Sequence, residues 1–182
     1  MSKRKNKTKK PVDYFARNKK SRNRGYRFEH WLVQKIESYA TKWHARRLGG
    51  TSTNMPDVLA VNNQQSKMFA LEAKSAMDVK RIYIPLDEIQ RCVDMLTMFA
   101  LYKDRRVILS FKFSIAKGRP IYYHFEFPSA HFPYLKDGAS VYCMRDGHGV
   151  FEAGPEYTDR KHGLPAFSLD SLGVFQTPQQ GY

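Results

Sequence analysis

The sequence has few cysteines, no long apolar run and too few acidic residues to balance its basic ones. Its 182 residues include two cysteines, which cannot build the disulfide framework of a small secreted domain. No apolar run approaches the roughly 20 residues that cross a bilayer, and no apolar segment follows the basic N-terminus as it does in a secretory signal. We therefore expect an intracellular protein, cytoplasmic or nucleoid-associated, in a reducing compartment.

Cysteine and histidine patterns typical of zinc sites are also missing. The two cysteines and six histidines show no close spacing such as Cys-x2-Cys, so a structural zinc site is not expected. Cys92 falls on the apolar stripe of a predicted helix, where we expect a buried thiol. The aromatic run 122–125 could stack on nucleic-acid bases, but the alternating burial of a strand explains it better.

The positive charge is concentrated at the N-terminus. The chain has 31 Lys and Arg residues against 17 acids, a net charge of +14, of which residues 1–25 carry +10. Such a segment can neutralise phosphates and release counterions when it binds DNA or RNA. A solubilising end or a localisation patch is the simpler alternative, and charge alone does not say whether a nucleic acid is cut. We expect DNA contacts from Lys19, Lys20, Arg24 and Arg27.

The pattern of apolar residues predicts an α/β fold. Helical spacing indicates helices over about 25–41 and 86–102, and strand patterns cover about 57–61, 67–74, 82–84, 106–113 and 121–127. This order favours a mixed β-sheet flanked by helices. Beyond Phe127 the pattern weakens to a predicted hairpin with strands at 140–144 and 150–152. We expect three parts: a flexible basic arm (1–24), a core (25–127), and a C-terminal extension packed on or following the core (128–182).

Two adjacent predicted strands carry the most informative residues. The segment 55–61 reads Met-Pro-Asp-Val-Leu-Ala-Val and the segment 68–74 reads Met-Phe-Ala-Leu-Glu-Ala-Lys. Because strand side chains alternate between faces, Glu72 and Lys74 project from the same face. Asp57 lies where the preceding strand begins. Two carboxylates and an ammonium group held together in this way can bind Mg²⁺ next to a phosphodiester.

Phosphodiester hydrolysis needs an activated water, stabilised phosphoryl oxygens and an assisted leaving group. A hard cation supplies much of this, and Asp57 and Glu72 offer it suitable oxygens. The Ala73 carbonyl would add a neutral oxygen ligand. Lys74 can steady the scissile phosphate and lower the pKa of the attacking water. These residues therefore predict a Mg²⁺ site, in which Mn²⁺ could substitute.

Each short pattern has a simpler explanation. Pro-Asp and Glu-x-Lys occur by chance in many proteins, and an ordinary Glu–Lys pair on a half-exposed strand would look the same. Glu29 borders the apolar face of the first predicted helix, from which a carboxylate can reach a site between helix and sheet. An ordinary glutamate near a helix start is the alternative there.

Taken together, the patterns are far more specific. The segments 25–29 (Gly-Tyr-Arg-Phe-Glu), 46–52 (Arg-Arg-Leu-Gly-Gly-Thr-Ser), 56–60 (Pro-Asp-Val-Leu-Ala), 71–75 (Leu-Glu-Ala-Lys-Ser) and 82–84 (Ile-Tyr-Ile) resemble the archaeal Holliday-junction resolvase family of PD-(D/E)xK nucleases. The order and spacing match from about residue 24 to 127. The resemblance implies a restriction-endonuclease-like fold, a homodimer, Mg²⁺ dependence and paired cuts across a four-way DNA junction.

The resemblance also implies roles for single residues. It makes Glu29 the helix acid of the site, Asp57 and Glu72 the metal ligands, and Lys74 the active-site lysine. The family uses a serine in the loop before the aspartate, and the residue that matches it is Ser52.

Other carried-over roles have less certain positions. Thr51 and Thr53 flank Ser52 with further hydroxyl groups. Either Arg46 or Arg47 matches a basic residue that contacts backbone phosphate. Gln90 lies near a polar helix position of related nucleases. The long basic arm and the residues from about 128 onward depart from the family pattern.

Two questions stay open at this point. The helix at 86–102 carries Met95, Met98 and Phe99 in addition to its core stripe, so part of it could pack against a second copy of the chain, or it could present one wide core-facing stripe. The resolvase function has two alternatives: a PD-(D/E)xK nuclease acting on another DNA structure, and a non-catalytic DNA-binding protein of the same fold.

Overall fold

The computed structural model of the chain describes residues 14–39, 42–49, 54–116 and 118–173, with side chains from Ser21 onward apart from that of Tyr39. The elements follow in the order α1 (Tyr14–Tyr39), β1 (His44–Arg47), β2 (Val58–Asn62), β3 (Lys67–Met77), β4 (Arg81–Ile84), α2 (Leu86–Met98), β5 (Asp104–Ser114), β6 (Ile121–Phe127), η1 (Ser129–Tyr134), β7 (Ser140–Met144), β8 (Gly149–Glu152), β9 (Lys161–Gly163) and η2 (Leu169–Gly173). Both η elements are short 3₁₀ helices.

The strands form two sheets. The larger sheet has the order β1-β2-β3-β5-β6, and the smaller has the order β4-β7-β8-β9. In the larger sheet only β3 and β5 run parallel. A parallel pair requires a crossover between its strands, and β4 and α2 provide it here. The mixed sheet flanked by helices confirms the predicted α/β fold class.

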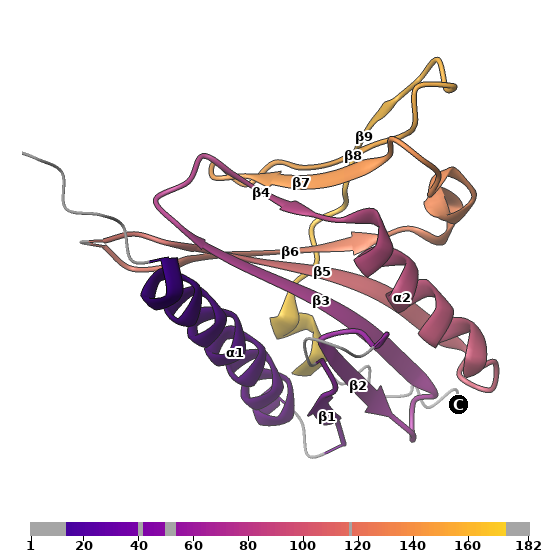
Figure 1. Cartoon of the computed structure of the whole chain (residues 1–182). Coiled ribbons are helices and arrows are strands. Elements are labelled where there is room, and N and C mark those ends of the chain that lie inside the picture. The colour runs from indigo at the N-terminus through magenta and orange to yellow at the C-terminus, as the bar shows by residue number, and fades with distance from the viewer. Residues whose placement is uncertain (1–13, 40–41, 50–53, 117, 174–182) are drawn as a thin grey trace, which may run out of the picture.

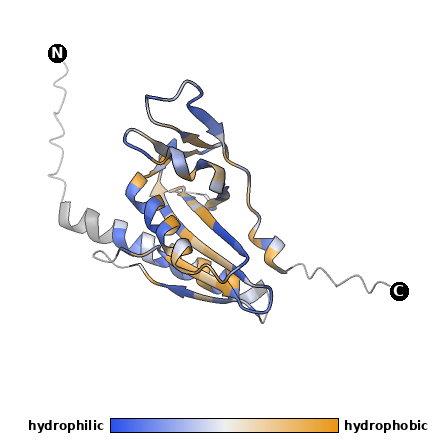
Figure 2. Cartoon of the chain, turned by 90° about the vertical axis from the view of Figure 1, so that its right-hand side faces the viewer, coloured by the Kyte–Doolittle hydropathy of each residue, from blue (hydrophilic) through white to orange (hydrophobic). Residues whose placement is uncertain are grey.

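The larger sheet separates two hydrophobic clusters, with α1 on one face and α2 with the smaller sheet on the other (Figure 1). The division follows from side-chain alternation along β3. Met68 and Ala70 are buried with α2 and the smaller sheet, whereas Phe69 and Leu71 are buried with α1. In Figure 2 the central strands carry mostly hydrophobic residues and the loops mostly hydrophilic ones.

Helix α1 begins at Tyr14, eleven residues before the predicted start at 25. Residues 14–24 of the predicted arm therefore belong to a helix, and Gly25 lies inside it. The sequence signal was weak because this segment has no apolar stripe, although its Lys, Arg and Ala residues favour helix. The buried residues Phe28, Leu32 and Ile36 anchor the helix further along. Neither described helix combines the length and apolarity of a membrane span.

The segment after β6 shares the core of the preceding elements. Strands β7 and β8 pair as the predicted hairpin, and Gly147 in the turn has a φ of +101°, which favours glycine. Val141, Cys143 and Phe151 are fully buried in the cluster that contains α2. Cys92, on α2, is buried and free as predicted. The division of the chain at 127/128 stays a prediction.

Candidate active site

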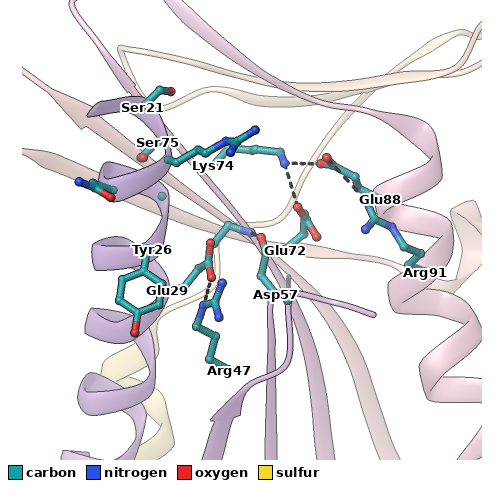
Figure 3. A pocket seen from close by; sticks show the side chains of 15 residues that line it. Ser21, Tyr26, Glu29, Arg47, Asp57, Glu72, Lys74, Ser75, Glu88 and Arg91 are labelled. Atoms are coloured by element: carbon teal, nitrogen blue, oxygen red, sulfur yellow. Dashed lines mark hydrogen bonds and ion pairs between the residues drawn. The ribbon is translucent and has the colours of Figure 1, made fainter. Parts of the chain in front are cut away.

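A notch in the larger sheet lies between the N-terminal part of α1 and the start of α2 (Figure 3). Pairing between β2 and β3 ends at Val58 and Leu71, while β3 continues beside β5 to Met77. Beyond Leu71, no described strand pairs with the β2-facing edge of β3. A cavity of about 580 Å³ occupies this place, and Glu29, Asp57, Glu72, Ala73 and Lys74 all line it.

Asp57 is held by three hydrogen bonds from backbone N–H groups. Leu48 and Gly49 donate their backbone N–H groups to its carbonyl oxygen over 2.9 and 3.2 Å. The backbone N–H of Ala73 donates to its side-chain Oδ2 over 2.9 Å. A Cβ on Gly49 would lie 2.7 Å from Asp57 Oδ1 and 3.0 Å from its Cα. Glycine at 49 is therefore needed for this close approach.

Glu72 and Lys74 project from the same face of β3, as the alternation predicts. Lys74 Nζ lies 3.1 Å from Glu72 Oε1 and 2.5 Å from Glu88 Oε2. Glu88 belongs to the first turn of α2, and its Oε1 lies 3.6 Å from Arg91 Nη2. The lysine ammonium group is thus held between a carboxylate from the sheet and one from a helix.

Glu29 reaches the cavity from α1. Its side chain pairs with Arg47 of β1, whose Nε donates to Oε2. The Arg47 guanidinium also lies 4.7 Å from the centre of the Tyr26 ring. Of the two candidate arginines, Arg47 lines the cavity, whereas Arg46 pairs with Glu37 over 2.7 Å and does not line it.

The site concentrates negative charge in a buried place. Burial and the neighbouring Asp57 charge raise the pKa of Glu72 to about 10, against the opposing effect of Lys74. Burial and Asp57 likewise raise the pKa of Glu29, although Arg47 opposes the shift. Burial alone would lower the pKa of Lys74, but Glu72 and Glu88 outweigh it and raise that pKa. In the metal-free protein, burial and the Asp57 charge therefore favour the protonated form of Glu72.

The donor atoms fit a magnesium ion. No three His, Cys, Asp or Glu side chains within the described ranges form a metal cluster, but Mg²⁺ is usually held by one or two carboxylates together with waters and substrate phosphates. Asp57 and Glu72 supply two carboxylates. Because the N–H of Ala73 faces the open edge of β3, its carbonyl faces the same side of the strand. A divalent cation here would replace the proton on Glu72.

The structure does not bring every predicted site residue to the cavity. Gln90 donates instead to Asp94 over 2.7 Å and does not line the cavity. Ser52 lies outside the described residues, as do the side chains of Lys19 and Lys20. Arg24 and Arg27 are not in the cavity lining either. They approach Lys112 of β5, and their charges add to burial in lowering its pKa.

Several residues that line the cavity were given no site role by sequence reasoning, among them Gly49, Glu88 and Arg91. A glycine next to the predicted loop was a usable signal for Gly49. For Glu88 there was no usable signal in the sequence, because the helix dipole already explains a carboxylate in the first turn of a helix. Only the packing of α2 against β3 shows that Glu88 points at Lys74.

Residues 20–120 match the family described as archaeal Holliday junction resolvase (Hjc). The match covers more than half of the chain and includes every residue of the cavity described above. The chain belongs to this family. The resemblance found in the sequence is therefore confirmed, and the segment after β5, from β6 to η2, lies beyond the match to the resolvase family.

A resolvase is among the solved structures to which the chain is similar. It is Archaeoglobus fulgidus Hjc, a Holliday junction resolvase from an archaeal hyperthermophile, with 18% sequence identity and a TM-score of 0.41. The similarity covers 82% of this chain and 94% of that one. A comparison with curated proteins gave no match.

Proposed function

We propose that this chain is a Mg²⁺-dependent endonuclease that resolves four-way DNA junctions by paired, symmetric phosphodiester hydrolysis. One observation supports the nuclease chemistry above the others. Carboxylates from α1, from the residue before β2 and from β3 line one cavity together with the Lys74 ammonium group. Binding alone does not require this set of groups, and the family membership adds the junction as substrate.

Three of the acidic residues of the cavity, together with Ala73 and Lys74, have chemical roles in this proposal. Asp57, Glu72 and the Ala73 carbonyl would hold the cation, which supplies Lewis-acid stabilisation of the phosphoryl oxygens and an activated water. Lys74 places a positive charge where the scissile phosphate enters. Glu29 borders the same cavity and is oriented by Arg47, so it can accept a hydrogen bond from the attacking water.

Symmetric cutting requires two copies of the site. One chain has a single Asp57–Glu72–Lys74 set, and a homodimer with a two-fold axis presents two. The end of α2 offers apolar surface for such contacts, since Met98, Phe99 and Leu101 are 68%, 42% and 94% exposed. Met95 is buried in the core instead. We therefore assign the dimer contact to the end of α2 and the turn that follows.

A cleavage assay tests the proposal. Labelled four-way junction, fork and linear duplex of matched sequence are incubated with the full chain in Mg²⁺ and in EDTA. We expect cuts in the junction with Mg²⁺ and none with EDTA. Asp57→Asn should reduce the rate by at least about 10³-fold while it leaves junction binding within a factor of two or three. Equal rates on all three DNAs would indicate a nuclease with another substrate, and binding without cutting would indicate a non-catalytic protein.

A further inference from the structure

Glu88 contacts the active-site lysine but lies outside the set of residues with a proposed chemical role. Its Oε2 lies 2.5 Å from Lys74 Nζ, and its side chain is only 17% exposed. In Figure 3 dashed lines join the Lys74 ammonium group to Glu72 and to Glu88. Glu88 comes from α2, whereas Glu72 and Lys74 come from the same strand.

A lysine side chain needs such a contact if its ammonium group is to keep one orientation. Its charge ends a flexible four-carbon stem with several rotamers, all of which must be restricted before the charge has a fixed place. Glu72 lies two residues away on the same strand and limits the ammonium group from one side, at 3.1 Å. Glu88 limits it from the side of α2. Two charge-assisted contacts from different elements define a direction that one contact does not.

The carboxylate of Glu88 is itself held in place. Its Oε1 faces Arg91 Nη2 one helical turn further on, at 3.6 Å. The neighbouring residues Ile89 and Cys92 are fully buried, which anchors this end of α2 against β3 and β5. The first turn of a helix also favours a negative charge. Glu88 therefore projects toward Lys74 from a helix turn that its buried neighbours anchor.

We propose that Glu88 is a positioning residue, which holds the Lys74 ammonium group toward the phosphate in the cavity and contacts no substrate itself. This inference rests on the proposed nuclease function. Loss of the contact leaves Lys74 chemically intact but free to sample other rotamers. The expected result is a slower chemical step with unchanged DNA affinity, because orientation contributes to the transition state more than to binding.

The kinetic test uses Glu88→Gln and Glu88→Ala with a matched control. Asp94→Asn removes an exposed carboxylate from the same helix, outside the cavity. Single-turnover cleavage of the junction in Mg²⁺ should slow about tenfold in both Glu88 variants, with Kd for DNA unchanged and with D94N like the wild type. In a Lys74→Met background, E88Q should have no further effect, since Glu88 acts only through Lys74.

A second measurement does not depend on cleavage. NMR order parameters of the Lys74 ammonium group in the metal-free protein should fall in E88Q and stay unchanged in D94N. Unchanged order in E88Q, a faster rate in that variant, or a further rate loss in the K74M background would each overturn the proposal. A wild-type chain that cuts no DNA would refute the proposed function instead, and the order parameters would then decide on Glu88 by themselves.

Discussion

At the scale of single residues, the site depends on two carboxylates that approach each other in a buried place. Burial raises the pKa of Glu72, and the charge of Asp57 raises it further, to about 10. This arrangement is unfavourable while both groups are ionised and becomes favourable when a proton or a cation joins them. The free energy of unfolding should therefore depend both on proton binding and on metal binding at these two carboxylates.

The stability of the metal-free protein should fall as pH rises. A carboxyl group whose pKa is raised on folding contributes stability below its unfolded pKa of 4.5 and loses that contribution up to about 10. Glutamine at position 72 cannot ionise. The free energy of unfolding of Glu72→Gln should therefore fall less steeply with rising pH than that of the wild type, by up to about 1.4 kcal/mol per pH unit. Urea unfolding in EDTA from pH 5 to 9 measures the difference. Identical slopes for both proteins would contradict the assigned pKa.

Gly49→Ala should displace Asp57. The added Cβ would meet Asp57 Oδ1 at 2.7 Å, and such overpacking typically costs about 1–3 kcal/mol. We expect that loss of stability in urea unfolding, together with weaker stabilisation by added Mg²⁺. Gly163→Ala is the control, because its Cβ would have no heavy atom within 4 Å. Equal behaviour of the two variants would remove the proposed role of Gly49.

At the scale of elements, the length of β3 creates the site. Strand β3 extends beyond the end of its partner β2. The unpaired edge of β3, together with α1 and α2, therefore encloses a cavity that would be absent if the two strands ended together. The two ends of helix α2 present different groups. Its first turn holds Glu88 beside Lys74, and its last turn and the residues after it expose Met98, Phe99 and Leu101.

The apolar end of α2 predicts how the chain associates. Met98→Lys combined with Leu101→Lys should convert a dimer into a monomer, because both positions are largely exposed and would be buried only by a second copy. Fold stability should change by less than about 0.5 kcal/mol per site. Sedimentation equilibrium at micromolar concentration measures the mass. Met77→Lys, at another exposed position, should stay dimeric, and a monomeric wild type would reject the prediction.

At the scale of the whole molecule, charge is distributed unevenly. Residues 1–13 contain six basic residues and one acid, while the described core holds acids and bases paired around the cavity. In the proposed function, catalysis and long-range attraction to DNA therefore belong to different parts of the chain. The N-terminal residues would attract the phosphates of the substrate, and the cavity would hydrolyse the phosphodiester bond.

Deletion of residues 1–13 should weaken junction binding and flatten its salt dependence. Each phosphate contact contributes about 0.9 to the slope of log K against log salt, so six basic residues can lower that slope by up to about 5. Cleavage at saturating protein should persist, since no cavity residue is removed. Titrations of junction DNA at several salt concentrations measure the slope, and an unchanged slope would contradict the assignment.

The sequence by itself determined the α/β class, most of the strands, and the placement of Asp57, Glu72 and Lys74 on two neighbouring strand segments. These follow from alternation and spacing within short segments, where local geometry decides which side chains share a face. It could also place Glu29 at the edge of a helix face. The helical state of 14–24 was missed because no apolar stripe marks that segment.

Only the tertiary structure decided which distant groups meet. It selected Arg47 over Arg46 as the partner of Glu29, placed Glu88 and not Gln90 at the cavity, and opened the edge of β3 beyond Leu71. The physical reason is that these contacts depend on strand lengths and on the packing of helices against the sheet. Such relations join residues far apart in the chain, so no local pattern encodes them.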